Sequence, residues 1–236
     1  MQTTPVRRRR RIGCVVGLVL ALALLVGGTL LADRVTRGVA EDVAADAVRQ
    51  KTSATDVHVT VEGFPFLTQL ARGALDDVRV RAATATLRGL DVTDLRITAT
   101  GVAVREPRGA EHVRATATVP TAALAELLRE RTGWDLALRV DGDRLVAEGE
   151  AAGVPAAVTL TLAAAGADGV TAAIESATLG GLTIDAGVLP DGLASRITEL
   201  RLTDQLPAGA RVTAATVQAD GVHLAVELDD LTLDEL

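Results

Sequence analysis

The N-terminus consists of a charged block followed by a long apolar run. Five consecutive arginines, Arg7–Arg11, precede an uncharged stretch from Ile12 to Ala32 made mainly of Leu, Val, Ala and Gly. About 20 such residues suffice to cross a bilayer as a helix, and an arginine block marks the cytoplasmic side. The pattern predicts a transmembrane or signal segment in residues 1–32 and an exported domain in residues 33–236.

This segment is either retained as an anchor or removed as a signal peptide. Signal peptides have a shorter apolar stretch that ends at a small-x-small cleavage site. The candidate sites near Gly28 and Ala32 carry the bulky Val26 and Leu30 at their −3 positions. We therefore expect an uncleaved anchor in the cell membrane, with a cytoplasmic N-terminus and a periplasmic domain. Cleavage would instead release a secreted domain.

A helical pattern follows the apolar run directly. Apolar residues recur at every fourth position from Val35 to Ala47, with charged residues elsewhere, which predicts an amphipathic helix from Asp33 to about Lys51. No helix breaker separates it from the apolar run. The helix therefore either continues the anchor outward, holding the domain near the membrane, or packs against the sheet that follows.

Farther along the chain the apolar period changes to strict alternation, which is typical of half-buried β-strands. Turn sequences such as Asp220-Gly221 separate many of these segments, so neighbouring strands are expected to pair antiparallel. The alternating segments are residues 57–61, 78–82, 95–99, 113–119, 136–140, 154–162, 170–174, 212–217 and 222–228.

Two further helices and one irregular strand complete the predicted fold. A proline-led helix runs from Pro120 to Leu128 and ends near Gly133, and a second runs from about Pro190 to Leu200. The alternation shifts by one residue at Thr93-Asp94, which predicts a bulge or tight turn and hence a bent sheet. The predicted class is α+β with one large, curved antiparallel sheet.

The charge of the exported part argues against nucleic-acid binding. The whole chain has a formal net charge of −7, and without the five positive charges of Arg7–Arg11 the remainder carries −12. Binding to phosphate backbones requires clustered Lys and Arg, but here the exported arginines are scattered singly among more numerous carboxylates. We therefore expect no nucleic-acid partner.

The few aromatic residues are concentrated in one loop. Both phenylalanines of the chain lie in the segment Gly63-Phe64-Pro65-Phe66-Leu67, and there is one tryptophan and no tyrosine. Proline favours extended backbone before it, so Phe64 and Phe66 are expected to project from a stiff, non-helical loop. The loop either plugs the end of an apolar core or forms an apolar lip that enters a bilayer or closes over a lipid.

The chain offers few residues for catalysis. Its three histidines lack partners at metal-ligand spacing, its three serines lie outside any nucleophile elbow, and its glycine pairs lack a phosphate-loop context. The single cysteine, Cys14, excludes an internal disulfide. We expect no enzymatic activity, no metal site and no cofactor.

Several of these motifs resemble one known family. The arginine block, apolar anchor, helix, aromatic loop and the strand around Val78-Arg79-Val80 together resemble the actinobacterial LmeA-like phospholipid-binding proteins. The segment from Leu206-Pro207 is similar to the C-terminal pattern of that family. The aromatic loop is the most specific of these motifs.

The resemblance implies a periplasmic, membrane-associated protein that binds phospholipid and supports cell-envelope biogenesis, in relatives the maturation of lipomannan-type glycolipids. It also implies a curved sheet that wraps a long helix, similar to tubular lipid-binding folds. A bent sheet lined by Val, Leu and many Ala would leave space for an acyl chain. Alanine-rich packing could equally bring the layers closer together.

Two hypotheses about function follow. In the first, the sheet interior holds acyl chains, and the lipid or membrane contacts are Phe64, Pro65, Phe66 and Leu67. Trp134, at the start of a strand, is expected as a core or rim residue and as a further candidate for this contact. In the second, the protein is an anchored, non-enzymatic adaptor that recruits envelope enzymes, and its aromatic residues belong to the core.

Overall fold

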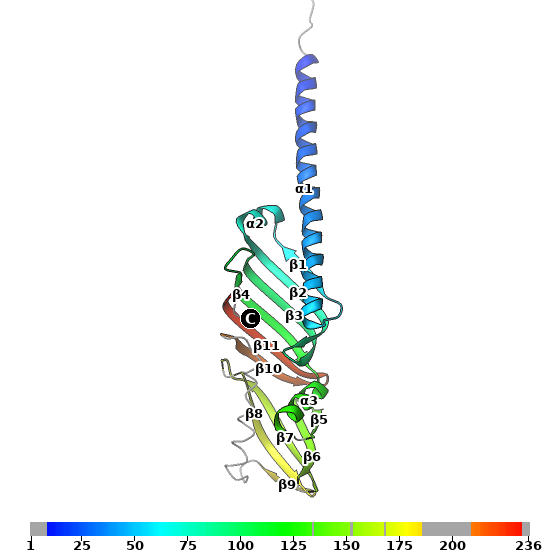
Figure 1. The fold of residues 1–236 in the computed structure, drawn as a ribbon, viewed down its shortest axis with the longest axis vertical. Helices are drawn as coiled ribbons and strands as arrows, with labels where there is room; N and C mark the ends of the chain where they lie inside the picture. Colours follow the sequence, from blue (N-terminus) through cyan, green and yellow to red (C-terminus); the bar gives the residue numbers. More distant parts are fainter. Residues whose placement is uncertain (1–8, 134, 152, 168, 186–208, 233–236) are drawn as a thin grey trace, which may run out of the picture.

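The structure is a computed structural model that describes residues 9–133, 135–151, 153–167, 169–185 and 209–232. A long helix, α1 (Arg9–Thr52), leads into two antiparallel sheets that follow one another along the long axis of the molecule (Figure 1). The helix extends well beyond the first sheet at its N-terminal end. Among the described residues, no helix combines the length and the apolar character needed to cross a membrane.

The first sheet has six strands in the order β1-β2-β3-β4-β11-β10, and every neighbouring pair is antiparallel. Its middle strands are long, because alternating apolar residues continue through most of each strand. The strands are β1 (His58–Glu62), β2 (Ala74–Leu87), β3 (Leu90–Ala103), β4 (Gly109–Val119), β10 (Arg211–Gln218) and β11 (Gly221–Thr232).

The second sheet has five strands in sequence order, and each pairs antiparallel with the next. The first sheet meets it through β10, where the Val212 N–H donates to the Gly166 carbonyl at 2.9 Å. The strands are β5 (Ala137–Asp141), β6 (Arg144–Ala151), β7 (Val154–Ala164), β8 (Val170–Leu179) and β9 (Leu182–Asp185).

The structure confirms the α+β class and the antiparallel pairing but corrects the prediction of one large sheet. The strands form two sheets, and neither is closed into a barrel. The strands β6 and β9 were not predicted. The predicted bulge is confirmed, since the register between β3 and β4 shifts between Thr93 and Arg96 and Asp94 has a positive φ of 50°. The predicted helix from Pro190 to Leu200 lies outside the described residues.

Helix α1 is continuous across the boundary between the apolar run and the predicted amphipathic helix, and its C-terminal part also packs on the first sheet. The packed residues are not the predicted apolar stripe. Val35, Val39 and Val43 are 67%, 58% and 64% exposed, whereas Ala45 is buried and Val48 is partly buried against the main core. Small side chains on this face let the helix lie close to the sheet.

Two short helices close the ends of the first sheet (Figure 1). Helix α2 (Phe66–Arg72) lies near the point where α1 leaves the sheet, and it ends at Gly73, whose φ of 82° is left-handed. Helix α3 (Thr121–Thr132) begins after Pro120, as predicted, and places Leu124 and Leu127 in the core between the two sheets. The prediction of a wholly non-helical aromatic loop is wrong, because Phe66 is the first residue of α2.

Candidate functional site

The two phenylalanines have opposite environments. Phe66 is 2% exposed and packs with Val61 and Leu75 in a small core between α2 and the sheet. Phe64 is 65% exposed. The exposed Pro65 separates them and precedes the first turn of α2 in an extended conformation. Phe66 is therefore a core residue, as one expectation had it, whereas Phe64 is exposed, as the alternative role in membrane or lipid contact requires.

Phe64 belongs to a small exposed apolar surface. Leu67 and Leu70 on α2 are 39% and 41% exposed. Leu67 and Leu70 are three residues apart, so they lie on the same face of the helix. We call Phe64, Leu67 and Leu70 the loop surface. Exposed apolar groups of this kind, close together in the sequence, mark a surface suited to an apolar environment.

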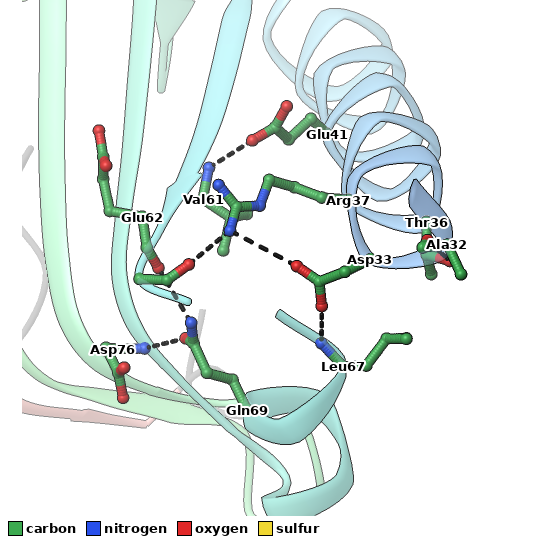
Figure 2. Close-up of polar contacts among 11 residues, drawn as sticks. Ala32, Asp33, Thr36, Arg37, Glu41, Val61, Glu62, Leu67, Gln69 and Asp76 are labelled. Atoms are coloured by element: carbon green, nitrogen blue, oxygen red, sulfur yellow. Dashed lines mark hydrogen bonds and ion pairs between the residues drawn. The ribbon is translucent and has the colours of Figure 1, made fainter. Parts of the chain in front are cut away.

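Helix α1 fixes the position of the loop surface through a buried carboxylate. Asp33, which is 2% exposed, accepts the backbone N–H of Leu67 at 2.7 Å, as Figure 2 shows. This bond satisfies one of the free N–H groups in the first turn of α2, a task that no side chain of the loop itself performs. Arg37, one turn later on α1, donates to the carbonyl of Gly63. The loop surface is therefore held at the point on α1 where the apolar run ends.

Two further side chains, Glu41 and Gln69, add three hydrogen bonds to this joint (Figure 2). Glu41 accepts the backbone N–H of Val61 on the edge strand β1 at 2.8 Å. Gln69, only 1% exposed, accepts the Asp76 N–H at 2.8 Å and donates to the Glu62 carbonyl at 3.2 Å. The side chain of Gln69 thus links α2 to both neighbouring strands.

Glycine is required at position 63 for two reasons. Its φ of +92° is left-handed, and a Cβ there would lie 2.5 Å from Nε2 of Gln69. A side chain at this position would therefore displace Gln69 from its hydrogen bonds. The Gly-Phe-Pro-Phe sequence combines a glycine that permits the turn, an exposed aromatic and a buried aromatic.

A large apolar cavity lies between the two sheets and α3. Its volume is about 530 Å³, within the range of about 300–1,000 Å³ that is typical of small-molecule sites. The lining side chains are almost all aliphatic and come from β3, β4, β11, α3 and the second sheet. Examples are Ile97, Val226, Leu128, Leu160 and Ala172.

The cavity extends along most of β11. Its lining includes both Val222 and Leu231 on that strand, and nine residues of strand span about 30 Å. The register places Leu231 near the end of the sheet that carries α2, since the neighbouring Thr232 pairs with Gly109. The cavity therefore runs from near the α2 end of the first sheet toward the second sheet.

Small side chains leave this space open. Ala115 and Ala117 on β4 line the cavity, and no aromatic side chain among the described residues does so. A few polar residues are also part of the lining, among them Lys51 and Arg88, both of which are exposed. These two residues mark where the cavity meets solvent.

The three histidines that were considered for catalysis are not part of the cavity lining, and each has a polar partner. His112 on β4 bonds to Asp229 on β11 at 2.7 Å, and His223 bonds to Asp220 at 2.7 Å. His58 bonds to the Asp56 carbonyl at 3.0 Å. Within the described ranges, no group of three potential ligands could hold a metal ion.

The contact between His112 and Asp229 predicts a pH effect. The hydrogen bond from His112, assisted by the positive charge of Arg211, lowers the pKa of Asp229 below its ordinary value. Because the carboxyl pKa is lower in the folded protein, the ionised carboxylate stabilises the fold at pH values above the unfolded pKa of about 3.9. This contribution disappears as the pH falls through the lower pKa of the folded state. Asp229→Asn should thus reduce the free energy of unfolding slightly at neutral pH and have no effect once the pH lies below the lowered pKa of the folded state.

Urea unfolding at a series of pH values measures this difference. Asp143→Asn, in the exposed turn between β5 and β6, is the matched control and should leave the acid dependence unchanged. A pH-independent effect of Asp229→Asn would show that the ionised carboxylate does not stabilise the fold.

Of the predicted contact residues, the structure leaves Phe64, Pro65 and Leu67 exposed and buries Phe66. Trp134 lies outside the described residues. The sequence reasoning missed Leu70, which helical spacing from Leu67 could have indicated. It also missed Lys51 and Arg88, because their meeting at one cavity depends on contacts between distant segments.

The fold and the cavity define an α+β protein with a large internal apolar cavity. Residues 31–227 match the LmeA-like phospholipid-binding family, and the chain belongs to that family. The family is described by phospholipid binding and not by a catalytic activity. No curated protein and no solved structure matches the chain, so the likeness to tubular lipid-binding folds stays a prediction.

Proposed function

We propose that this protein is a membrane-anchored envelope protein that holds the acyl chains of a phospholipid in its apolar cavity and contacts the membrane through the loop surface. The observation that carries the proposal is the cavity of about 530 Å³ with an aliphatic lining, in a member of a phospholipid-binding family. A role in envelope lipid or glycolipid biogenesis is part of the proposal.

The hydrophobic effect favours this occupant. Each methylene group moved from water into an apolar site contributes about 0.8 kcal/mol, so ten buried methylenes contribute about 8 kcal/mol before the cost of ordering the chain. The length of about 30 Å along β11 provides room for an extended chain. An adaptor with a fully packed interior would have no such cavity, so the cavity favours lipid binding over the adaptor hypothesis.

The joint between α1 and the loop supports membrane contact. If residues 12–32 cross the bilayer, Asp33 lies at the membrane surface, and its bond to Leu67 holds α2 at the same level. Phe64, Leu67 and Leu70 would then face the headgroup region, where exposed apolar side chains are stabilised. The cavity would begin close to this end of the sheet and lead away from the membrane.

Native mass spectrometry of the full-length protein, released from detergent and followed by lipid extraction, tests the binding of phospholipid. We expect co-purified phospholipid at a defined ratio to protein. A protein that carries no lipid and takes up none when phospholipid is added would contradict the proposal and favour the adaptor hypothesis.

The membrane contact has its own test, which does not depend on the cavity. Tryptophan fluorescence of Phe64→Trp in proteoliposomes should be strongly quenched by lipids brominated on their acyl chains, because the indole replaces an exposed aromatic at the membrane surface. Leu182→Trp is the matched control, since Leu182 is 74% exposed on β9 in the second sheet. Equal quenching in the two variants would show that the loop surface does not enter the membrane.

A further inference from the structure

Two cationic side chains meet at the rim of the apolar cavity. Lys51 lies in the last turn of α1, and Arg88 lies in the turn between β2 and β3. Both line the cavity and both are exposed. Lys51 is the only lysine of the chain, whose exported part carries a net charge of −12. An excess of positive charge is therefore not a general property of its surface.

The chain holds these two residues at the same end of the first sheet. Directly after α1, the Thr55 N–H donates to the Thr84 carbonyl at 3.0 Å, and the two threonine hydroxyls are 2.7 Å apart. These bonds attach the end of α1 to β2 a few residues before Arg88. The two cations therefore come from segments that are tied together, and their common location does not depend on long, flexible connections.

The backbone at Arg88 is unusual for an arginine. Leu87 pairs with Leu90, so Arg88 and Gly89 form a two-residue hairpin turn in which both have positive φ, 50° and 84°. Such turns favour Asn, Asp or Gly at the first position, because other side chains are strained in the left-handed region. An arginine in a strained position next to a cavity is a reason to look for a role of its side chain.

Two neutral polar groups near this rim form hydrogen bonds of their own. The Thr52 hydroxyl donates to the Val48 carbonyl at 2.8 Å, and the Thr86 hydroxyl donates to the Asp91 carboxylate at 2.7 Å. Asp91 alternates with Leu90 and Val92, which line the cavity, so its carboxylate belongs to the opposite face of β3. The positive charge at the rim thus comes from Lys51 and Arg88.

We propose that Lys51 and Arg88 form a phosphate-binding site at the cavity rim, which holds the phosphodiester of a phospholipid whose acyl chains occupy the cavity. Ammonium and guanidinium groups bind phosphate through charge-assisted hydrogen bonds. An apolar cavity that ends in two cations matches the chemistry of such a lipid, which is apolar in its chains and anionic at its phosphate. This inference rests on the proposed function. It adds a site for the phosphate group, which the apolar cavity itself does not bind.

The location of the site also gives the bound lipid a direction. Lys51 follows Asp33 by 18 residues of continuous helix, a distance of about 27 Å along α1. If Asp33 marks the membrane surface, the phosphate is held about 27 Å away from it. The lipid would then be fully removed from the bilayer, with its headgroup presented at the membrane-distal rim.

The test compares lipids that differ only in the phosphate group. Native mass spectrometry of the full-length protein would measure the uptake of dipalmitoyl phosphatidylglycerol and of dipalmitoylglycerol, which has the same chains and no phosphate. Lys51→Met together with Arg88→Met should weaken uptake of phosphatidylglycerol about ten- to hundredfold, since each lost charge-assisted hydrogen bond contributes to affinity. Uptake of dipalmitoylglycerol should be unchanged.

A matched control removes two positive charges from the strands of the hairpin that carries Arg88. Arg81 and Arg96 pair across β2 and β3, and both are exposed. Arg96 lies between Leu95 and Ile97, which line the cavity, and hence on the outer face of the sheet. Arg81→Met with Arg96→Met should leave both lipids bound as in the wild type. An equal loss of phosphatidylglycerol in this control would overturn the site.

The remaining outcomes separate this inference from the proposed function. If the wild type binds neither lipid, the proposed function fails. A second outcome is that the wild type binds both lipids, and the variant that lacks Lys51 and Arg88 either still binds both or binds neither. In that case the cavity binds lipid, but Lys51 and Arg88 do not form a phosphate-binding site. Titration with inorganic phosphate, followed by ³¹P NMR, shows whether the site takes a lipid phosphate or free phosphate. If the wild type binds inorganic phosphate but no phosphatidylglycerol, and the variant does not bind inorganic phosphate, the site exists but its ligand is free phosphate.

Discussion

The full-length Ala115→Trp protein should bind phospholipid more than about a hundredfold more weakly than the wild type. Ala115 lies in the middle of β4, where it pairs with Ile97 on β3 and Val226 on β11, and all three line the cavity. An indole at this point would occupy the space available to the acyl chain. If it displaces about four methylene groups, the loss is about 3 kcal/mol.

The substitution should not prevent folding, because the indole enters existing space. Overpacking is costly where a core is already full, but a cavity of about 530 Å³ gives the ring room to adopt a normal rotamer. Circular dichroism checks the fold, and native mass spectrometry with lipid extraction measures the bound lipid.

Thr98→Trp is the matched control for Ala115→Trp. Thr98 lies on β3 between Ile97 and Ala99, so its side chain belongs to the other face of the sheet. This variant should bind phospholipid as the wild type does. A folded Ala115→Trp protein with normal lipid content would show that the acyl chains are not bound in the cavity.

The local features of the fold were predictable from the sequence. Strict alternation located most strands, Pro120 marked the start of α3, and the shift of alternation at Thr93-Asp94 gave the bulge that the structure has. These signals are local, since they depend on backbone preferences and on which neighbouring residues share a face. The short strand β9 was missed because its four residues are all exposed and carry no pattern of burial.

The packing of α1 shows where the local pattern misleads. The valines at every fourth position predicted the buried face, yet Val35, Val39 and Val43 are exposed and alanines contact the sheet. The polar residues Asp33 and Glu41 lie toward the domain instead, because the backbone N–H groups of α2 and β1 need acceptors there. Only the tertiary structure shows that α1 turns these two carboxylates toward the domain, where they accept backbone N–H groups of neighbouring elements.

The candidate site was predictable only in part for a related reason. The Gly63 to Leu67 segment was recognisable because its aromatic residues are adjacent in the sequence. The cavity is formed by strands and helices from both sheets, and its cationic rim joins Lys51 to Arg88. Periodicity reports which face of a strand is apolar, but it does not report whether that face is filled by other side chains or left open.

The largest effect on the end of the first sheet that carries α2 is expected from Asp33→Ala. This substitution removes a buried carboxylate that accepts the Leu67 N–H at 2.7 Å and lies 4.0 Å from the guanidinium of Arg37. A hydrogen bond to a buried charged group contributes about 1.5–3 kcal/mol, and loss of the neighbouring charge adds to this, so the joint should be weakened by about 2–4 kcal/mol. The amide protons of α2 should then exchange at least about thirtyfold faster.

Hydrogen exchange followed by mass spectrometry of residues 64–72 in the full-length protein measures this effect. Asp46→Ala is the matched control, because Asp46 lies on the same helix and its ion pair with Arg49 is exposed, so its loss should cost less than about 1 kcal/mol. Asp33→Asn keeps an oxygen acceptor for Leu67 and should fall between the two. Equal exchange of α2 in the Asp33→Ala and Asp46→Ala proteins would mean that α1 does not hold the loop surface, so α1 would not fix the position of Phe64 relative to the membrane.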